Sequence, residues 1–365
     1  MKFRVAVFPF TEQLLPVVRH FNLLQDVYGI RKVIARKGMG LSGKDVAFLC
    51  NHPPVGIPVT DMDNADDESW DILLVNYSDL DLAADCVMGF LRNCLKEGKE
   101  IMLLCDSIDC EKNKFIAKCC ADFPSQITVL SADAYSCYHH SFAETKFEPL
   151  RIPVLMIGSL IKQSDPLEVL ISLKLEFLKH NRHISCLTTS NMGLLAGMHS
   201  YTHIVNNRDA YSEEDKIILL NQLARNIIRK ERPELLLVEA PDAVMKYNDV
   251  APNGFGIQTY MISLALQPNL FVCCVPMDLT DQNFIAAISK DFSHRYSCAI
   301  SAVQVSNSLI DSMSIAQNEG LSSVHADMDM VCNAIHSATQ NQIFPIFDVV
   351  SQGAQGMYEH ICSLL

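Results

Sequence analysis

A strand, a loop and a helix between residues 152 and 180 hold the residue types of greatest chemical interest. Residues 152–157 form a short apolar run that predicts a buried strand, and Asp165 followed by Pro166 predicts an N-cap and the first turn of a helix. A loop between a strand and a helix N-terminus is where nucleotide-binding proteins hold phosphate, because the first N–H groups of the helix are unpaired and carry partial positive charge. The loop is therefore a candidate phosphate-binding site.

The loop departs from the phosphate-binding pattern GxxxxGK[ST] at three of its defining positions. Counting from Gly158, the second glycine, the lysine and the hydroxyl residue are replaced by Gln163, Ser164 and Asp165, and Lys162 stands two places before the pattern's lysine. An ordinary strand-to-helix turn is the alternative interpretation. If the loop does bind, ATP and Mg²⁺ are the candidate cofactors, and the predicted cofactor-binding residues are Gly158, Ser159, Lys162, Ser164 and Asp165.

Glu239 and His199 have the chemistry to take part in a reaction. Glu239 ends the apolar run Leu235–Val238, and a carboxylate after such a run resembles the group that approaches Mg²⁺ in nucleotide-binding proteins. His199 lies in NMGLLAGMHSY, a glycine-rich turn after a predicted strand, where open parallel sheets bind ligands. We predict both as catalytic candidates. The alternatives are that Glu239 only caps a strand and that His199 is a hydrogen-bonded loop histidine.

Other candidate binding features are weaker. The basic, glycine-rich stretch RKGMGLSGKDVA at residues 36–47 could meet an anion, but its glycines are equally suited to turning the chain. Fourteen cysteines lie mostly in apolar runs and form no CxxC pair, so we predict free, buried thiols and no metal ligands. The adjacent His139 and His140 point in different directions on any regular element, which disfavours a joint metal site.

The composition favours a globular protein and argues against a general nucleic-acid binder. The 365 residues are 49% hydrophobic and 19% charged, which is ample for packed cores. The formal net charge of −13 is opposite to the basic excess of nucleic-acid-binding domains. Without a membrane-length apolar run or a signal peptide, the sequence predicts a cytoplasmic protein that is not bound to a membrane.

Strand-like and helix-like segments alternate along both halves of the chain, which predicts parallel sheets with crossover helices. Residues 1–130 predict a Rossmann-like α/β domain, but no GxGxxG follows the first strand, so a dinucleotide is not indicated. The polar and aromatic residues 131–151 are interpreted as a linker. Residues 152–365 predict a second α/β domain, similar to P-loop nucleotide-binding proteins but with a degenerate phosphate loop.

Several segments together resemble the peptide maturation system protein family, encoded beside radical S-adenosylmethionine enzymes and precursor peptides in clostridial-type bacteria. The resemblance covers most of the chain in order, and it implies a Rossmann-like domain, a P-loop-like domain and a link to ribosomally made, modified peptides. It does not imply a chemical step for the protein itself. The segments that carry it are RVAVFPFTEQLLPVV, RKGMGLSGKDVA, DPLEV, NMGLLAGMHSY and RPELLLVEAPDAVMKYNDVAPNGFGI.

Three functions follow from these observations. The first is an accessory protein that binds a precursor peptide or a peptide-modifying enzyme on a nucleotide-binding type of scaffold. The second is a ligase- or kinase-like enzyme that uses ATP and Mg²⁺ at the degenerate loop and Glu239. The third is a degenerate small-molecule enzyme that uses His199 and Glu239. Whether the protein is an enzyme stays open at this stage, and homo-oligomerisation is compatible with all three.

Overall fold

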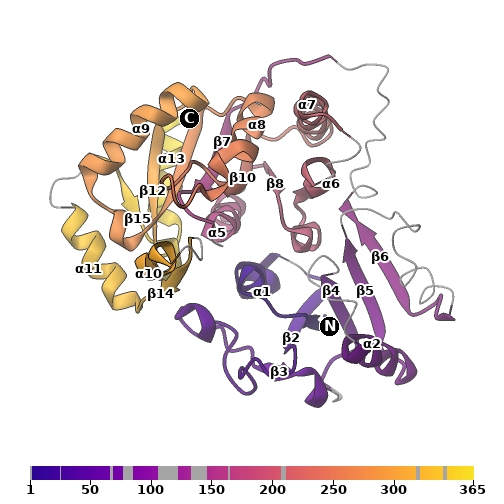
Figure 1. The fold of residues 1–365 in the computed structure, drawn as a ribbon. Coiled ribbons are helices and arrows are strands. Elements are labelled where there is room, and N and C mark those ends of the chain that lie inside the picture. Colours follow the sequence, from indigo (N-terminus) through magenta and orange to yellow (C-terminus); the bar gives the residue numbers. More distant parts are fainter. Residues whose placement is uncertain are drawn as a thin grey trace. The chain divides into compact units, whose positions relative to one another are not determined.

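The computed structural model contains two compact units, each built on its own sheet (Figure 1). The first unit comprises Met1–Phe48, Pro54–Cys137 and Ser190–His203, and the second comprises Leu49–Pro53, Tyr138–Thr189 and Ile204–Leu365. The structure describes residues 2–24, 26–65, 69–76, 85–105, 122–132, 146–162, 165–206, 211–317, 321–339 and 343–365.

The first unit is a parallel six-stranded sheet in the order β3-β2-β1-β4-β5-β6. This order is that of dinucleotide-binding Rossmann folds, in which the strand order reverses beside the first strand. Right-handed crossovers place α1 and α2 on opposite faces of the sheet. The elements are β1 (Phe3–Phe8), α1 (Leu15–Leu24), β2 (Tyr28–Ala35), β3 (Val59–Asp61), β4 (Ile72–Asn76), α2 (Asp85–Lys96), β5 (Glu100–Cys105) and β6 (Ile127–Ser131).

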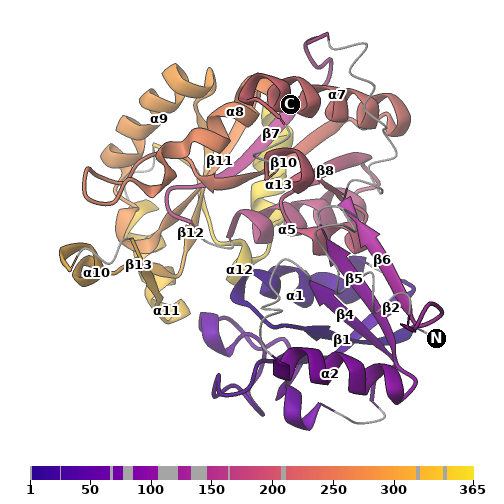
Figure 2. The ribbon, with the colours of Figure 1, turned by 45° about the vertical axis from the view of Figure 1, so that its right-hand side comes forward.

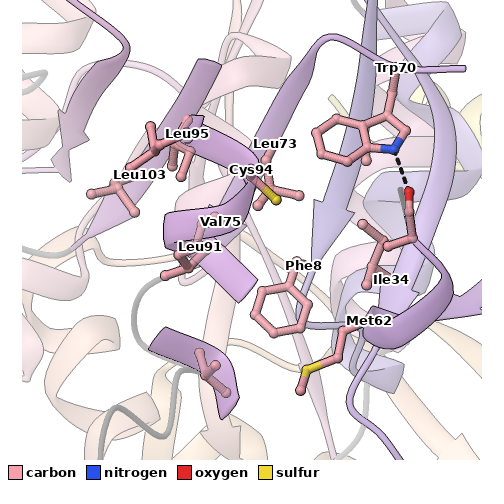
Figure 3. Close-up of a cluster of buried hydrophobic side chains, with 14 residues drawn as sticks. Phe8, Ile34, Met62, Trp70, Leu73, Val75, Leu91, Cys94, Leu95 and Leu103 are labelled. Atoms are coloured by element: carbon pink, nitrogen blue, oxygen red, sulfur yellow. Dashed lines mark hydrogen bonds between the residues drawn. The ribbon is translucent and has the colours of Figure 1, made fainter. Parts of the chain in front are cut away.

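One part of the core of the first unit lies between this sheet and α2, and Figure 3 shows this cluster. Phe8 and Leu73 from the sheet meet Leu91 and Leu95 from the helix, and all four are buried. Trp70 closes the cluster and donates its indole N–H to the Ala65 carbonyl at 3.0 Å, so its polar atom is satisfied. Burial of this apolar surface is the main contribution to the stability of the unit.

The second unit is organised around a seven-stranded sheet in the order β15-β12-β11-β7-β10-β8-β9, with a separate antiparallel pair, β13 and β14. Its strands are β7 (Val154–Ser159), β8 (Ile184–Thr188), β10 (Leu235–Ala243), β11 (Leu270–Pro276), β12 (Ile300–Ser306), β13 (Ser308–Ile310), β14 (Ser323–His325) and β15 (Ile346–Phe347). The edge strand β9 (His199–Ser200) belongs to the segment Ser190–His203, which groups with the first unit. Its helices are α5 (Asp165–Lys179), α6 (Thr202–Val205), α7 (Glu213–Glu231), α8 (Ile257–Leu266), α9 (Gln282–Tyr296), α10 (Ser312–Ala316), α11 (Met328–Thr339), α12 (Val349–Gln352) and α13 (Gln355–Leu364).

Strand β7 is the point at which the connections of this sheet change direction. It pairs in parallel with β10 on one side and β11 on the other. The chain leaves β7 toward β8 through α5, whereas it leaves β10 and β11 in the opposite direction through α8 and α9 (Figure 2). Because crossovers are right-handed, α5 lies on one face and α8 and α9 on the other. Ligands of open α/β sheets bind at such a switch point, outside the carboxyl ends of the strands.

Two segments belong to a different unit from the one expected from the sequence. Ser190–His203, expected in the domain 152–365, groups with the first unit, where the buried Leu195 lines a small apolar space with Phe21 and Met102. Leu49–Pro53, expected in the domain 1–130, groups with the second unit, where the Cys50 carbonyl accepts a hydrogen bond from Asn307 Nδ2 at 2.6 Å. Most of the expected linker, residues 133–145, lies outside the described residues, together with His139 and His140.

Two glycine-rich stretches are explained by the turns they make. Gly38, Gly40 and Gly43 in residues 36–47 have φ values of 87°, 67° and 78°, which strain other residues. In NMGLLAGMHSY, residues 191–196 form a buried 3-10 helix that Gly197 ends with φ 65°. Among the described helices, none combines the length and apolarity that are needed to cross a bilayer.

Cysteine reactivity is the first testable consequence. Ten described cysteines are free; seven of these are buried, whereas Cys86 and Cys332 are exposed. We expect a thiol reagent to modify Cys86 and Cys332 rapidly in the native protein and all fourteen cysteines after denaturation without reductant. Peptide mapping after timed alkylation measures this. Fewer than fourteen reactive thiols in the denatured, unreduced protein would contradict free cysteines.

The second prediction concerns Gly158, at the end of the central strand. An added Cβ would lie 2.7 Å from Val244 Cγ1 and 3.1 Å from the Ala240 Cβ. We expect Gly158→Ala to lower the free energy of unfolding by about 1–3 kcal/mol, since overpacking forces neighbours apart. Gly356→Ala, on α13 with its nearest contact at 3.5 Å, is the control and should be neutral or stabilising. The measurement is urea unfolding of the native protein and both variants. If Gly158→Ala were as stable as the native protein, Val244 and Ala240 would have to move aside at little cost.

Candidate functional site

Buried polar side chains lie at the carboxyl ends of the adjacent strands of the second sheet. The register places Ser159 of β7 beside Cys274 of β11, and both follow the buried apolar stretches of their strands. Six residues share this position and are all at least nine-tenths buried: Thr188, Glu239, Ser159, Cys274, Ser306 and Asp348. The row surrounds the switch point at β7, so this edge is the candidate functional site.

Two polar groups at the start of the loop after β7 are hydrogen-bonded to protein carbonyls. The Leu160 N–H donates to the Cys274 carbonyl at 3.0 Å, and the Ser159 hydroxyl donates to the Ile161 carbonyl at 2.5 Å. Leu160 and Ile161 are buried, whereas Lys162 is exposed. These N–H and O–H groups therefore face protein carbonyls and offer nothing to a phosphate. The predicted binding residue Ser164 and its neighbour Gln163 lie outside the described residues.

Asp165 is the first residue of helix α5, at the helix start that the sequence predicts. It accepts a hydrogen bond from the Ser306 hydroxyl at the end of β12, a partner that the local sequence cannot reveal. Its Oδ2 atom is buried and has no hydrogen-bond partner within the described chain. Burial, together with the neighbouring carboxyls of Glu168 and Asp348, raises the pKa of Asp165 to about 7, whereas Ser306 and His325 lower it.

Asp348 is a second buried carboxyl group in this cluster. Its Oδ1 atom caps α12 by accepting from the N–H groups of Val350 and Ser351 at 3.0 and 3.3 Å. Its Oδ2 atom has no hydrogen-bond partner among the described residues, although only 1% of the residue is exposed. An unsatisfied buried carboxylate oxygen is costly, and a bound cation or a proton would relieve the cost. Asp165 and Asp348 thus present two such oxygens at one sheet edge.

Asn307 orients His325 beside these carboxyl groups. Its Nδ2 atom donates to the carbonyls of Cys50 and Ala326 at 2.6 and 3.1 Å, which fixes the orientation of the amide. The amide oxygen therefore accepts from His325 Nδ1 and His52 Nε2, each at 3.3 Å. Because an amide oxygen only accepts, both of these ring nitrogens carry hydrogen. The network holds the His325 ring near the carboxyl cluster, where its charge lowers the pKa of Asp165.

Glu239 is buried and held by three hydrogen bonds. Thr188 Oγ1 and the Thr189 N–H donate to Oε2 at 2.6 and 3.0 Å, and Thr189 Oγ1 donates to Oε1 at 3.0 Å. Burial raises the pKa of Glu239, while these donors lower it. Strand β10 continues to Ala243 instead of ending before Glu239, with a break in register between the two residues. Burial raises the pKa of the Cys274 thiol well above its usual range. The nearby Asp165 and Glu239 carboxyls raise it further.

His199 is half-buried and belongs to the first unit, whereas Glu239 and Asp165 belong to the second. A joint site of His199 and Glu239 therefore stays a prediction. The sequence interpretation omitted Glu168, His325 and Asp348 from the site. Glu168 follows Asp165 by almost one helical turn, which is a readable signal. Asp348 comes after a strand of only two residues, and His325 comes from the small antiparallel pair, so neither has a clear sequence pattern.

Comparisons with known proteins add the fold but not an activity. A scan against family models found no matching model, and a search of curated proteins found no match. Among solved structures, the chain resembles a DUF1611 family protein from Anabaena variabilis, with a TM-score of 0.64 and 12% identity over 99% of this chain and 100% of that chain. An identity this low shows a shared fold alone.

Two further similarities are partial. Chloroplast FtsY from Physcomitrella patens aligns with 63% of this chain and 71% of its own, at 13% identity and a TM-score of 0.33. Hydrogenase maturation factor HypB from Archaeoglobus fulgidus aligns with 58% of this chain and 90% of its own, at 11% identity and a TM-score of 0.30. At such scores neither similarity identifies a function. The predicted fold class is confirmed at the level of α/β units built on parallel strands, and the first unit has the Rossmann strand order.

The raised pKa of Asp165 predicts how stability depends on pH. Between the usual pKa of 3.8 and the folded value of about 7, the native state holds a proton that the unfolded state lacks. The free energy of unfolding should therefore fall as pH rises from about 4 to 7. Asp165→Asn should remove that slope and be more stable than the native protein near pH 8 without divalent cations, by on the order of a few kcal/mol.

Urea unfolding across this pH range is the measurement, with Asp249→Asn as the control. Asp249 is an exposed aspartate that pairs with Lys246, and its side chain is 92% accessible. Its replacement should leave the slope of the native protein unchanged over this range. Parallel pH curves for the native protein and Asp165→Asn would show that Asp165 is ionised in the folded state.

Proposed function

We propose that the second unit binds a nucleoside triphosphate together with Mg²⁺, and that the cation is required for binding. The observation that carries this proposal is the pair of buried carboxylate oxygens without partners, on Asp165 and Asp348, at the carboxyl edge beside the switch-point strand. Oxygen ligands from aspartate suit Mg²⁺, which keeps several waters and usually takes one or two protein carboxylates together with phosphate oxygens.

The charge of the cluster explains why the cation is needed. The carboxyls of Glu168 and Asp348 both raise the pKa of Asp165, so they lie close enough to repel added negative charge. A bare triphosphate would meet this repulsion and a loop whose Leu160 N–H and Ser159 hydroxyl are already bonded to protein carbonyls. A divalent cation neutralises both the carboxyls and the phosphates, which makes the same edge favourable for a metal-bound nucleotide.

Under this proposal, two residues bind the cation, and two others contact the water and the phosphates. Asp165 stands where the standard loop has the serine or threonine that ligates Mg²⁺, so it and Asp348 would hold the cation. Bound Mg²⁺ would supply charge neutralisation to phosphate oxygens. Glu239 is held in a fixed orientation by Thr188 and Thr189, and its raised pKa suits a group that exchanges a proton with a bound water. Lys162, exposed at the loop, is available to the outer phosphates.

The resemblance noted in the sequence adds a partner to this activity. We propose that the protein serves the maturation of a ribosomally made peptide, binding a precursor peptide or a modifying enzyme while the second unit binds nucleotide. Support for this role comes from the sequence resemblance, and the fold is compatible with it. Titration of a labelled candidate precursor peptide with the protein, with and without Mg²⁺–ATP, tests the role; no binding to any such peptide in either state would argue against it.

Calorimetry tests the nucleotide proposal. Native protein should release or absorb measurable heat with Mg²⁺–ATP and none with ATP in the presence of a chelator. Asp165→Asn and Asp348→Asn should each weaken Mg²⁺–ATP binding at least tenfold, since each removes a cation ligand, while Asp249→Asn should bind as the native protein does. Urea midpoints confirm that the variants are folded.

Two results would overturn the proposal. Equal binding of ATP with and without Mg²⁺ would show a phosphate cradle that needs no cation. Absence of any binding of Mg²⁺–ATP by the folded native protein would show that the edge is only a structural relic of a nucleotide site.

A further inference from the structure

Helix α8 exposes an apolar stripe on the outside of the second unit. Ile257, Tyr260 and Leu264 follow one another at helical spacing and are 59%, 40% and 42% exposed. The other side of the helix is also apolar, with Ile262 and Leu266 fully buried. Figure 1 shows α8 in the outer layer, between α7 and α9. A helix that is apolar all round is normally covered on all sides.

A strained turn immediately before α8 displays one more aromatic ring. Asn253, Gly254, Phe255 and Gly256 all have positive φ, at 49°, 67°, 56° and 66°. Left-handed backbone is unfavourable for phenylalanine, yet Phe255 adopts it with 52% of the residue exposed. Strain of this kind persists at binding surfaces, where the conformation itself is needed.

The surrounding structure fixes this turn. A Cβ on Gly256 would lie 2.1 Å from the Val244 carbonyl oxygen, so only glycine fits there. Arg295 donates from Nη2 to the Phe255 carbonyl and lies over the Tyr260 ring, 5.7 Å from its centroid. The turn and the helix are therefore one rigid surface, and Phe255 is held outward.

We infer that this surface, formed by the turn and α8, is a twofold interface between two copies of the chain. With Tyr247 and Val250 from the preceding loop, the exposed apolar residues leave roughly 500 Å² uncovered, if a large side chain offers ~150–250 Å². Pairing the patch with itself would then bury roughly 1,000 Å², which is the lower limit for a biological interface.

The charges of the patch favour a second copy as the occupant. A twofold axis places each patch against itself, so a net charge would repel its own copy. Here charges of both signs are present: Lys246 pairs with Asp249 at 2.8 Å. The positive Arg295 contacts the Phe255 carbonyl, and the negative Asp242 lies beside Gly254 of the same turn, with Oδ2 3.3 Å from the place of a Cβ there. The charges at the patch therefore balance, and the rest of the face is aromatic and aliphatic, which can pack against its own copy.

The interface would also connect to the candidate site. Asn253, the first residue of the strained turn, donates from Nδ2 to the Leu160 carbonyl at 2.7 Å and to the Met245 carbonyl at 3.2 Å. Leu160 lies in the loop after β7, so a partner that fixes the turn also fixes the start of that loop. The inference rests on surface geometry and stands whether or not the edge binds nucleotide.

Sedimentation velocity over a wide concentration range tests the interface. The native protein should be a dimer, and the double variant Ile257→Lys with Leu264→Lys should be a monomer, with self-association weakened at least tenfold. Ile257→Glu with Leu264→Glu should also be a monomer. A mixture of the lysine and glutamate variants should form dimers again, because their patches attract each other.

A matched control is Leu178→Lys, a 51% exposed leucine of α5 on the opposite face of the sheet, which should leave the dimer intact. Circular dichroism shows whether each variant is folded. A native protein that is monomeric at all concentrations would overturn the inference, as would dimers that persist in the folded lysine variant, or a mixture of variants that stays monomeric.

Discussion

The constraint on which the second unit depends is the burial of carboxyl groups at the carboxyl edge of its sheet. A buried carboxylate must be hydrogen-bonded, protonated or bound to a cation, because its desolvation is otherwise too costly. Glu239 meets this need with three donors, whereas Asp165 and Asp348 each keep one oxygen without a partner among the described residues. The edge therefore holds one carboxyl group whose two oxygens are both hydrogen-bonded, and two carboxyl groups that each keep an oxygen available to a cation.

Topology explains why these groups meet. Asp165, Glu239 and Ser306 are separated by long stretches of chain, but the parallel strands that precede or carry them all end at the same edge. Gly158 permits this arrangement, since any side chain there would collide with Val244 and Ala240 and push β10 from β7. The glycine that resembles the start of a phosphate loop is thus first a packing residue. A packing role and a phosphate-loop role are compatible, because close strand contact is what brings Glu239 to the loop.

The sequence was sufficient for the fold class and for half of the site. Apolar runs of 4–8 residues bounded by turn residues indicate parallel strands well, and Asp-Pro marked the start of α5. Sequence reasoning could not show that the Asp165 carboxyl accepts a hydrogen bond from Ser306, because Ser306 lies at the end of β12, far away in the sequence. Nor could it show that NMGLLAGMHSY groups with the first unit, because the chain's return to an earlier unit leaves no local pattern. Asp348 was missed for a similar reason: its strand has only two residues, too few for a periodic signal.

The turn before α8 shows how a locally unfavourable sequence can be a consequence of the site. Gly256 is required because the Val244 carbonyl occupies the place of a side chain, and Val244 is itself the residue that packs over Gly158. Asn253 then donates to Leu160, two residues after that glycine. The close approach of β10 to β7 therefore fixes the position of Val244. The Val244 carbonyl in turn permits only glycine at position 256. The resulting turn leaves Phe255 exposed. The same contact that brings Glu239 beside the loop thus also shapes the exposed surface.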